Sequence, residues 1–148
     1  MAIGEICNRE VVIVHRGESV RTAAALMRQY HVGDVVVVEE RQEKRIPVGI
    51  LTDRDLVVKV VARKLDPDHL QVGDVMSAGV ETVVETAEIL PTIEKMRDEA
   101  IRRLPVVDDR GALVGIVTMD DMIDLLAEML DDLSRLVRRE RRRETVSD

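Results

Sequence analysis

The sequence predicts an α/β (α+β) fold built from two copies of one β-α-β-β-α unit, followed by a long C-terminal helix. A ten-residue phrase, VGILTDRDLV at 48–57, returns as VGIVTMDDMI at 114–123. The match extends over most of the chain at an offset of 69 residues, which falls to 66 at the phrase because a loop of the second copy is shorter. In both copies, valine-rich runs alternate with segments whose apolar residues recur at helical spacing. Two units of about 65 residues therefore make up nearly the whole chain.

Each copy is expected to contain the same elements in the same order. A short strand precedes a helix, two further strands follow, and a second helix begins directly at a threonine. The unbroken valine run of the middle strand predicts burial on both faces of its sheet. Pro91 lacks a backbone donor, so its helix should begin close to it. The expected strands are 11–14, 35–38 and 48–51 in the first copy and 80–83, 104–107 and 113–117 in the second.

The composition is that of a folded protein without a membrane span. About 45% of the residues are apolar and 34% are charged, which is typical of globular domains. No apolar run reaches the roughly 18 residues of a membrane helix, and the first residues lack the order of a signal peptide. A cytoplasmic location is expected. The single cysteine, Cys7, permits no internal disulfide, and its apolar surroundings favour a buried thiol.

Charge and aromatic content argue against nucleic-acid binding as the main function. The net charge of −7 divides into +3 on residues 135–148, which contain six arginines, and −10 on residues 1–134. An acidic body repels a phosphate backbone. Tyr30 is the only aromatic residue, so the chain has no platform on which bases could stack.

Residues for catalysis or metal binding are not grouped in the sequence. His15, His31 and His69 lie far apart, without a His or Cys partner at metal-ligand spacing. Neither a nucleophile with its base nor a glycine-rich phosphate loop is present. We therefore expect no enzyme, no metal site and no cofactor.

Two T-x-x-D phrases allow two interpretations. Each places a threonine where a strand ends and a helix begins, with an aspartate three residues later. One interpretation is a capping box that closes on the backbone. The other is a nucleotide site, in which the carboxylate accepts ribose hydroxyls and a preceding glycine lets the ligand approach the backbone. The residues are Gly49, Thr52 and Asp55 in the first copy and Gly115, Thr118 and Asp121 in the second.

The tandem arrangement, with VGDVMS, RRLPVVDDRGALVGIVT and the two T-x-x-D phrases, resembles the CBS domain pair, named after cystathionine β-synthase and also called the Bateman module. The resemblance covers about residues 5–130. It implies two repeats packed pseudo-symmetrically through small mixed sheets, with two clefts that bind adenosine compounds such as AMP, ADP, ATP, S-adenosylmethionine or NAD(H). We divide the chain into repeat 1 (1–70), repeat 2 (71–130) and a C-terminal helix extension with a basic tail (131–148).

The resemblance also implies which residues form each cleft. Asp55 and Asp121 match the positions that bind ribose, and Thr52 and Thr118 match the hydroxyl positions before them. The strand before the first helix of one repeat is expected to line the cleft of the other. The residues brought in this way are Asn8 and Ile13 for the cleft with Thr118 and Asp121, and Ser77 and Val80 for the cleft with Thr52 and Asp55.

Arg103, in the phrase RRLPVV, matches a position that often contacts phosphate, and Pro105 of the same phrase is a further candidate ligand-binding residue. Its counterpart in the first repeat has Asp34 at the position of Arg103. A carboxylate there should repel a phosphate chain, so the two clefts are expected to differ in affinity or in ligand. Arg54, inside TDRD, is either a compensating cation or a solvated helix residue.

The C-terminal helix is expected from Met119 to about Arg142. Its apolar residues form a heptad-like stripe of Ile123, Leu126, Leu130, Leu133 and Val137. This stripe packs either on the chain's own repeats or on a second subunit. The arginines beyond it are either a solvated end or a site for an acidic partner or an anionic surface.

We therefore predict a free-standing regulatory protein that senses an adenosine ligand and signals by changing shape or partner affinity. Its expected partners are a second copy in a homodimer and a regulated enzyme or transporter. The alternative is a structural or interaction module with vestigial clefts that acts through its C-terminal helix. Nucleic-acid binding through the arginine tail is a third, less favoured hypothesis.

Overall fold

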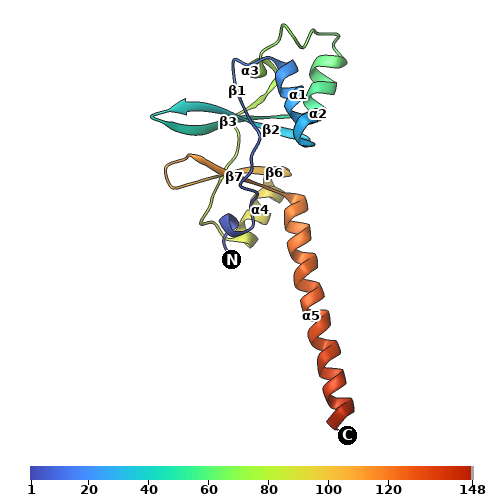
Figure 1. Cartoon of the computed structure of the whole chain (residues 1–148). Coiled ribbons are helices and arrows are strands. Elements are labelled where there is room, and N and C mark those ends of the chain that lie inside the picture. Colours follow the sequence, from blue (N-terminus) through green and yellow to red (C-terminus); the bar gives the residue numbers. More distant parts are fainter. Residues whose placement is uncertain (148) are drawn as a thin grey trace.

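The chain folds into two packed α/β halves and one long helix that projects away from them (Figure 1). The computed structural model describes residues 1–147. The order of elements confirms the β-α-β-β-α succession of each copy, although the first strand begins two residues later than expected in one copy and three later in the other. The elements are η1 (Ile3–Glu5), β1 (Ile13–His15), α1 (Val20–Tyr30), β2 (Asp34–Arg41), β3 (Lys44–Thr52), α2 (Asp53–Leu56), the π-helical turn η2 (Val57–Val61), α3 (Val72–Val75), β4 (Ser77–Ala78), β5 (Val83–Val84), α4 (Ile89–Glu99), β6 (Arg103–Val107), β7 (Leu113–Thr118) and α5 (Met119–Ser147).

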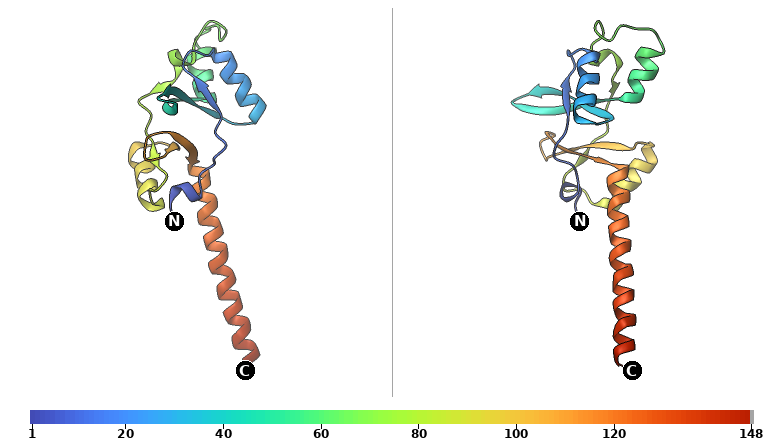
Figure 2. Two further views of the ribbon diagram at one scale, coloured as in Figure 1. Left: turned by 60° about the vertical axis from the view of Figure 1, so that its left-hand side comes forward. Right: turned by 45° about the vertical axis from the view of Figure 1, so that its right-hand side comes forward.

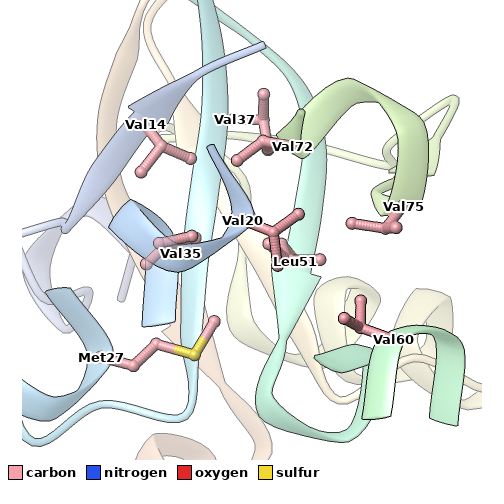
Figure 3. Packing of buried hydrophobic residues seen from close by; sticks show 10 residues of the cluster. Val14, Val20, Met27, Val35, Val37, Leu51, Val60, Val72 and Val75 are labelled. Carbon is pink, nitrogen blue, oxygen red and sulfur yellow. The ribbon is translucent and has the colours of Figure 1, made fainter. Parts of the chain in front are cut away.

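The first half is a four-stranded sheet that packs against helices. Its strand order is β1-β2-β3-β4, with β1 parallel to β2 and the other neighbours antiparallel. α1 begins after Ser19, whose side chain accepts a hydrogen bond from the amide of Thr22, and ends at His31 in the left-handed conformation. The core between helices and sheet is shown in Figure 3. Its buried residues are Val14, Val20, Ala23, Met27, Val35, Val37, Leu51, Val60, Val72 and Val75.

The second half repeats this plan with the three-stranded sheet β5-β6-β7. α4 begins at Ile89, so Pro91 lies in its first turn as predicted, where a missing donor breaks no helical bond. Pro105 is buried in β6 and comes just before Val106 and Val107, the two residues that pair with β5. The buried residues of this core are Ile3, Val83, Met96, Leu104, Val106, Val117 and Met122.

Each half receives a segment from the other repeat. Ile3 is fully buried in the second core, and Asn8 exchanges two backbone hydrogen bonds of 2.9 Å with Ile116 of β7. In return, β4 pairs with β3, and Val72 is buried in the first core. The exchange places Asn8 and Ser77 beside the strands that lead into the two T-x-x-D phrases.

The two sheets pack on each other through a small apolar layer. Val35 and Val37 of β2 face the first core, whereas Val36 and Val38 form a cluster with Ile116 of β7. All four valines have no exposed surface, which confirms the predicted burial on both faces. Full burial of a side chain of this kind contributes roughly 1.5–3 kcal/mol, so this layer helps to hold the two halves together.

Only the beginning of α5 packs on the body. Met119 and Met122 contact the second core, and the rest of the helix extends away from both halves in every view (Figure 2). Packing of the whole apolar stripe on the chain's own repeats is therefore wrong, since Ile123, Leu130 and Leu133 are all more than half exposed. The helix continues to Ser147, past the expected end near Arg142. Among residues 1–147, no helix is both long enough and apolar enough to cross a membrane.

Candidate ligand-binding clefts

Both T-x-x-D phrases form capping boxes at the point where a strand becomes a helix. In the first, the amide of Thr52 donates to Asp55 Oδ2 (3.0 Å) and the amide of Asp55 donates to Thr52 Oγ1 (3.1 Å). In the second, the amide of Thr118 donates to Asp121 Oδ2 (2.9 Å) and that of Asp121 to Thr118 Oγ1 (3.2 Å). Each box uses one carboxylate oxygen and leaves the other, so capping does not prevent either aspartate from binding a ligand.

The Thr118 cleft is a cavity of about 380 Å³ between the two halves. Asn8 reaches it through its backbone pairing with Ile116, as the resemblance implies. The floor combines apolar side chains with several charged groups, because the strand ends of both sheets meet here. The lining residues that bear on ligand binding are Asn8, Val11, Asp34, Arg103, Thr118 and Asp121.

The Thr52 cleft is a cavity of about 310 Å³ related to the first by the repeat. Ser77 and Val80 line it together with Thr52, so the structure brings these three predicted residues together. Arg103 lines both cavities. Among the described residues, the wall of the Thr52 cleft does not include Asp55.

The two aspartates differ in what binds their second oxygen. Asp55 Oδ1 forms an ion pair with Lys59 Nζ at 3.3 Å, and the same ammonium group donates to the carbonyl of Val75 at 3.1 Å. Leu125 stands at the position that corresponds to Lys59 in the second copy. Within residues 1–147, Oδ1 of Asp121 has no hydrogen bond or ion pair. Lys59 was not among the predicted residues, although a lysine four residues after an aspartate on a helix is a recognisable ion-pair pattern.

Arg103 and Asp34 form an ion pair across the junction of the two repeats. Arg103 Nε lies 2.5 Å from Asp34 Oδ2, and the Asp34 side chain is only 17% exposed. Burial raises the pKa of Asp34 above its ordinary value, and the charge of Arg103 opposes this effect only in part. The prediction that these charges lie in separate clefts is wrong, because both residues line the Thr118 cleft, where the Asp34 carboxylate pairs with the Arg103 guanidinium group.

Gly49 and Gly115 make room for the exchanged segments. A Cβ on Gly115 would lie 2.7 Å from Cys7 Sγ and 2.9 Å from the carbonyl of Asn8. A Cβ on Gly49 would lie equally close to Met76 Sδ and the carbonyl of Ser77. The close backbone approach expected at these glycines is therefore made by the chain itself, not by a ligand.

Three further predicted residues lie outside the walls of the two clefts as described. Ile13 lines an adjacent cavity of about 530 Å³ that shares Asn8 and Val11 with the Thr118 cleft. Arg54 is exposed on α2, which agrees with its interpretation as a solvated helix residue. Pro105 is buried in β6 opposite Ile116, where its role is packing.

Two packed β-α-β-β-α units with a cleft at each strand-to-helix junction define a tandem ligand-binding module. The chain belongs to the CBS domain family, whose model matches residues 3–62 and 72–128. An uncharacterized protein of Methanopyrus kandleri is 42% identical over 125 residues, which cover 84% of this chain and 62% of that protein. The chain thus spans less than two thirds of that relative.

Two similar solved structures contain adenosine compounds. A CBS domain protein from Pyrobaculum aerophilum complexed with AMP is 28% identical, with a TM-score of 0.73 over 82% of this chain and 89% of that one. A CBS domain pair complexed with 5′-methylthioadenosine and S-adenosyl-L-methionine is 26% identical, with a TM-score of 0.75 over 87% of this chain and 98% of that one. The family and its fold are thereby established for this chain.

Proposed function

We propose that this protein is a regulatory module that binds one adenosine compound in the Thr118 cleft. The observation that carries the proposal is the unpartnered Oδ1 of Asp121 at a cavity of about 380 Å³, set against Asp55, whose equivalent oxygen is bound by Lys59. A cavity of this size is within the range of small-molecule sites. The CBS family is typically regulatory, so we assign binding and not catalysis to this site.

The residues of the Thr118 cleft suit the parts of an adenosine ligand. Asp121 Oδ1 can accept hydrogen bonds from ribose hydroxyls, as acidic residues do in other nucleotide folds. Val11, Val12 and Ile116 provide an aliphatic surface for the base, which is consistent with the absence of Phe and Trp from the sequence. AMP and S-adenosylmethionine are the first candidates because related structures contain them. ADP, ATP and NAD(H) share the same adenosine group.

Ligand binding in this cleft would act on the packing of the two halves. Val11, Val12 and Asp34 belong to the first repeat, whereas Ile116 and Asp121 belong to the second, and all line the same cavity. A ligand that contacts residues of both repeats binds more tightly when the two repeats are packed closely. It therefore favours that packing, because a ligand shifts a conformational equilibrium only through its different affinities for the two states. A regulated enzyme or transporter would then respond to the altered surface.

The decisive experiment is calorimetric titration of AMP and S-adenosylmethionine into the wild type, Asp121→Asn and Asp55→Asn. Asparagine keeps the cap but replaces one carboxylate oxygen with an amide donor, so Asp121→Asn should weaken binding by at least about tenfold. Asp55→Asn is the matched control and should change affinity little. Equal losses in both variants, or no binding by the wild type, would refute the proposal.

A further inference from the structure

A second cavity adjoins the Thr118 cleft on the side of the first repeat. It has a volume of about 530 Å³ and shares part of its wall with that cleft, namely Asn8, Glu10, Val11, Val12 and Val32. The residues that it adds are Ile13 of β1 and Leu26 and Tyr30 of α1. Because so much of the wall is common to both, the two cavities are neighbouring compartments of one groove.

The two compartments differ in the charge of their walls, and this difference orients a ligand. The Thr118 cleft contains most of the charged groups, including Asp121, Arg102 and Arg103. The described wall of the second cavity has Glu10 as its single charged residue and consists otherwise mainly of aliphatic side chains. Burial of a charged group is unfavourable where no partner can bind it. An adenosine compound with its ribose on Asp121 therefore directs its polar end toward the arginines and its base toward the second cavity.

Tyr30 is fixed beside the second cavity by the end of α1. His31 ends the helix in the left-handed conformation, and the amide of Val32 donates to the carbonyl of Met27 at 3.1 Å. Leu26, which lines the same cavity, is one helical turn before Tyr30 and lies on the same face of α1. Tyr30 is 54% exposed and belongs to neither core. Its ring is thus held at the cavity without being used for packing of the fold.

We propose that Tyr30 is a specificity-determining residue that contacts the purine base of the ligand in the Thr118 cleft. This role rests on the proposed function, because the orientation of the ligand depends on Asp121. Tyr30 is the only aromatic residue in the chain. One ring cannot support a strand of nucleic acid, but it is sufficient for a single base, whose π face stacks favourably on an aromatic side chain. Val11 and Val32 line both compartments and would contact the same base.

Calorimetric titration of AMP and of S-adenosylmethionine tests the contact through substitution of Tyr30. Tyr30→Ala should weaken the binding of these ligands about 5- to 100-fold, the usual range for loss of one base–aromatic contact. Tyr30→Phe keeps the ring and should bind as the wild type does. Gln29→Ala is the matched control, since Gln29 is exposed on the same turn of α1 but lies outside the described walls of both compartments. Wild-type affinity in Tyr30→Ala, or equal losses in Tyr30→Ala and Tyr30→Phe, would overturn the proposal.

Tyrosine fluorescence reports the same contact without any change at Tyr30. The chain contains no tryptophan and one tyrosine, so its emission comes from Tyr30 alone. Addition of AMP or S-adenosylmethionine should change this emission in the wild type and far less in Asp121→Asn, which controls for light absorbed by adenine. Ribose 5-phosphate, which has no base, should leave the emission unchanged. Calorimetric binding without a change in emission would reject the contact with Tyr30 and leave the proposed function intact, whereas no binding by the wild type would reject both.

Discussion

The two clefts derive from one repeated unit but present different charges to a ligand. In the first repeat, Lys59 forms an ion pair with the carboxylate of Asp55 and donates a hydrogen bond to the carbonyl of Val75. At the equivalent position in the second copy, Leu125 leaves Asp121 Oδ1 available. The two repeats therefore share a backbone arrangement, but the second oxygen of Asp55 is bound by a lysine and that of Asp121 is not. We therefore expect ligand specificity in this pair of clefts to depend on the side chain four residues after each aspartate.

The largest effect should come from exchanging the residues that distinguish the clefts. Leu125→Lys provides a cation four residues after Asp121, and we expect it to weaken ligand binding by about 10- to 100-fold because the charged acceptor becomes occupied. Lys59→Met frees Asp55 and should add a second, weaker binding event. Calorimetric titration measures both changes, the first as the dissociation constant and the second as the number of ligands bound. Unchanged binding by Leu125→Lys would show that Asp121 does not contact the ligand.

Gly49 and Gly115, which pack against the segments exchanged between the repeats, allow a second comparison of the two clefts. Gly115→Ala and Gly49→Ala each force a Cβ to within 2.9 Å of a backbone carbonyl, so each should lower the free energy of unfolding by about 1–3 kcal/mol. Only Gly115→Ala displaces Asn8, and only this variant should also weaken ligand binding. Gly17→Ala is the control, since nothing lies within 4 Å of its Cβ position. Urea denaturation gives the stability changes, and equal stability in all three variants would contradict the expected clash.

Phosphate selectivity should respond to Asp34 with a smaller effect. Asp34→Asn removes the carboxylate that occupies Arg103, so the affinity for AMP relative to adenosine should rise about tenfold. Arg103→Gln should remove any preference for AMP. Parallel titrations with AMP and adenosine measure the ratio. A ratio that is the same in the wild type and Asp34→Asn would show that the ion pair does not control phosphate binding.

Local patterns predicted the repeat, the succession of helices and strands in each copy, and the capping boxes. The valine runs of β2 and the T-x-x-D phrases depend on neighbours within four residues, and their structures agree with the prediction. The ion pair of Asp34 with Arg103 could not be predicted in this way. These residues occupy equivalent positions 69 residues apart, and only the packing of two repeats about a pseudo-two-fold axis brings equivalent positions together.

The exposed apolar residues of α5 show a further limit of what a sequence pattern can predict. A heptad spacing predicts an apolar seam but does not identify what covers it. The exposure of Leu130 and Leu133 rejects the chain's own repeats as that cover. The exchanged segments show the same limit, because nothing near Gly115 in the sequence indicates that Asn8 packs beside it.

The smallest effect concerns the pH dependence of stability at Asp34. Burial raises the pKa of this carboxyl in the folded state above its ordinary value of 3.8. A raised pKa means that the folded state binds the proton of Asp34 more tightly than the unfolded state does. The stability gained from the protonated carboxyl is therefore fully present below pH 3.8 and is lost as the pH rises through the folded-state pKa. Asp34→Asn mimics the protonated form and should be more stable than the wild type at neutral pH. Thermal unfolding of both proteins between neutral pH and pH 3.8 should show that their difference in stability becomes smaller as the pH falls. A difference in stability that grows on acidification would mean that pairing with Arg103 outweighs burial.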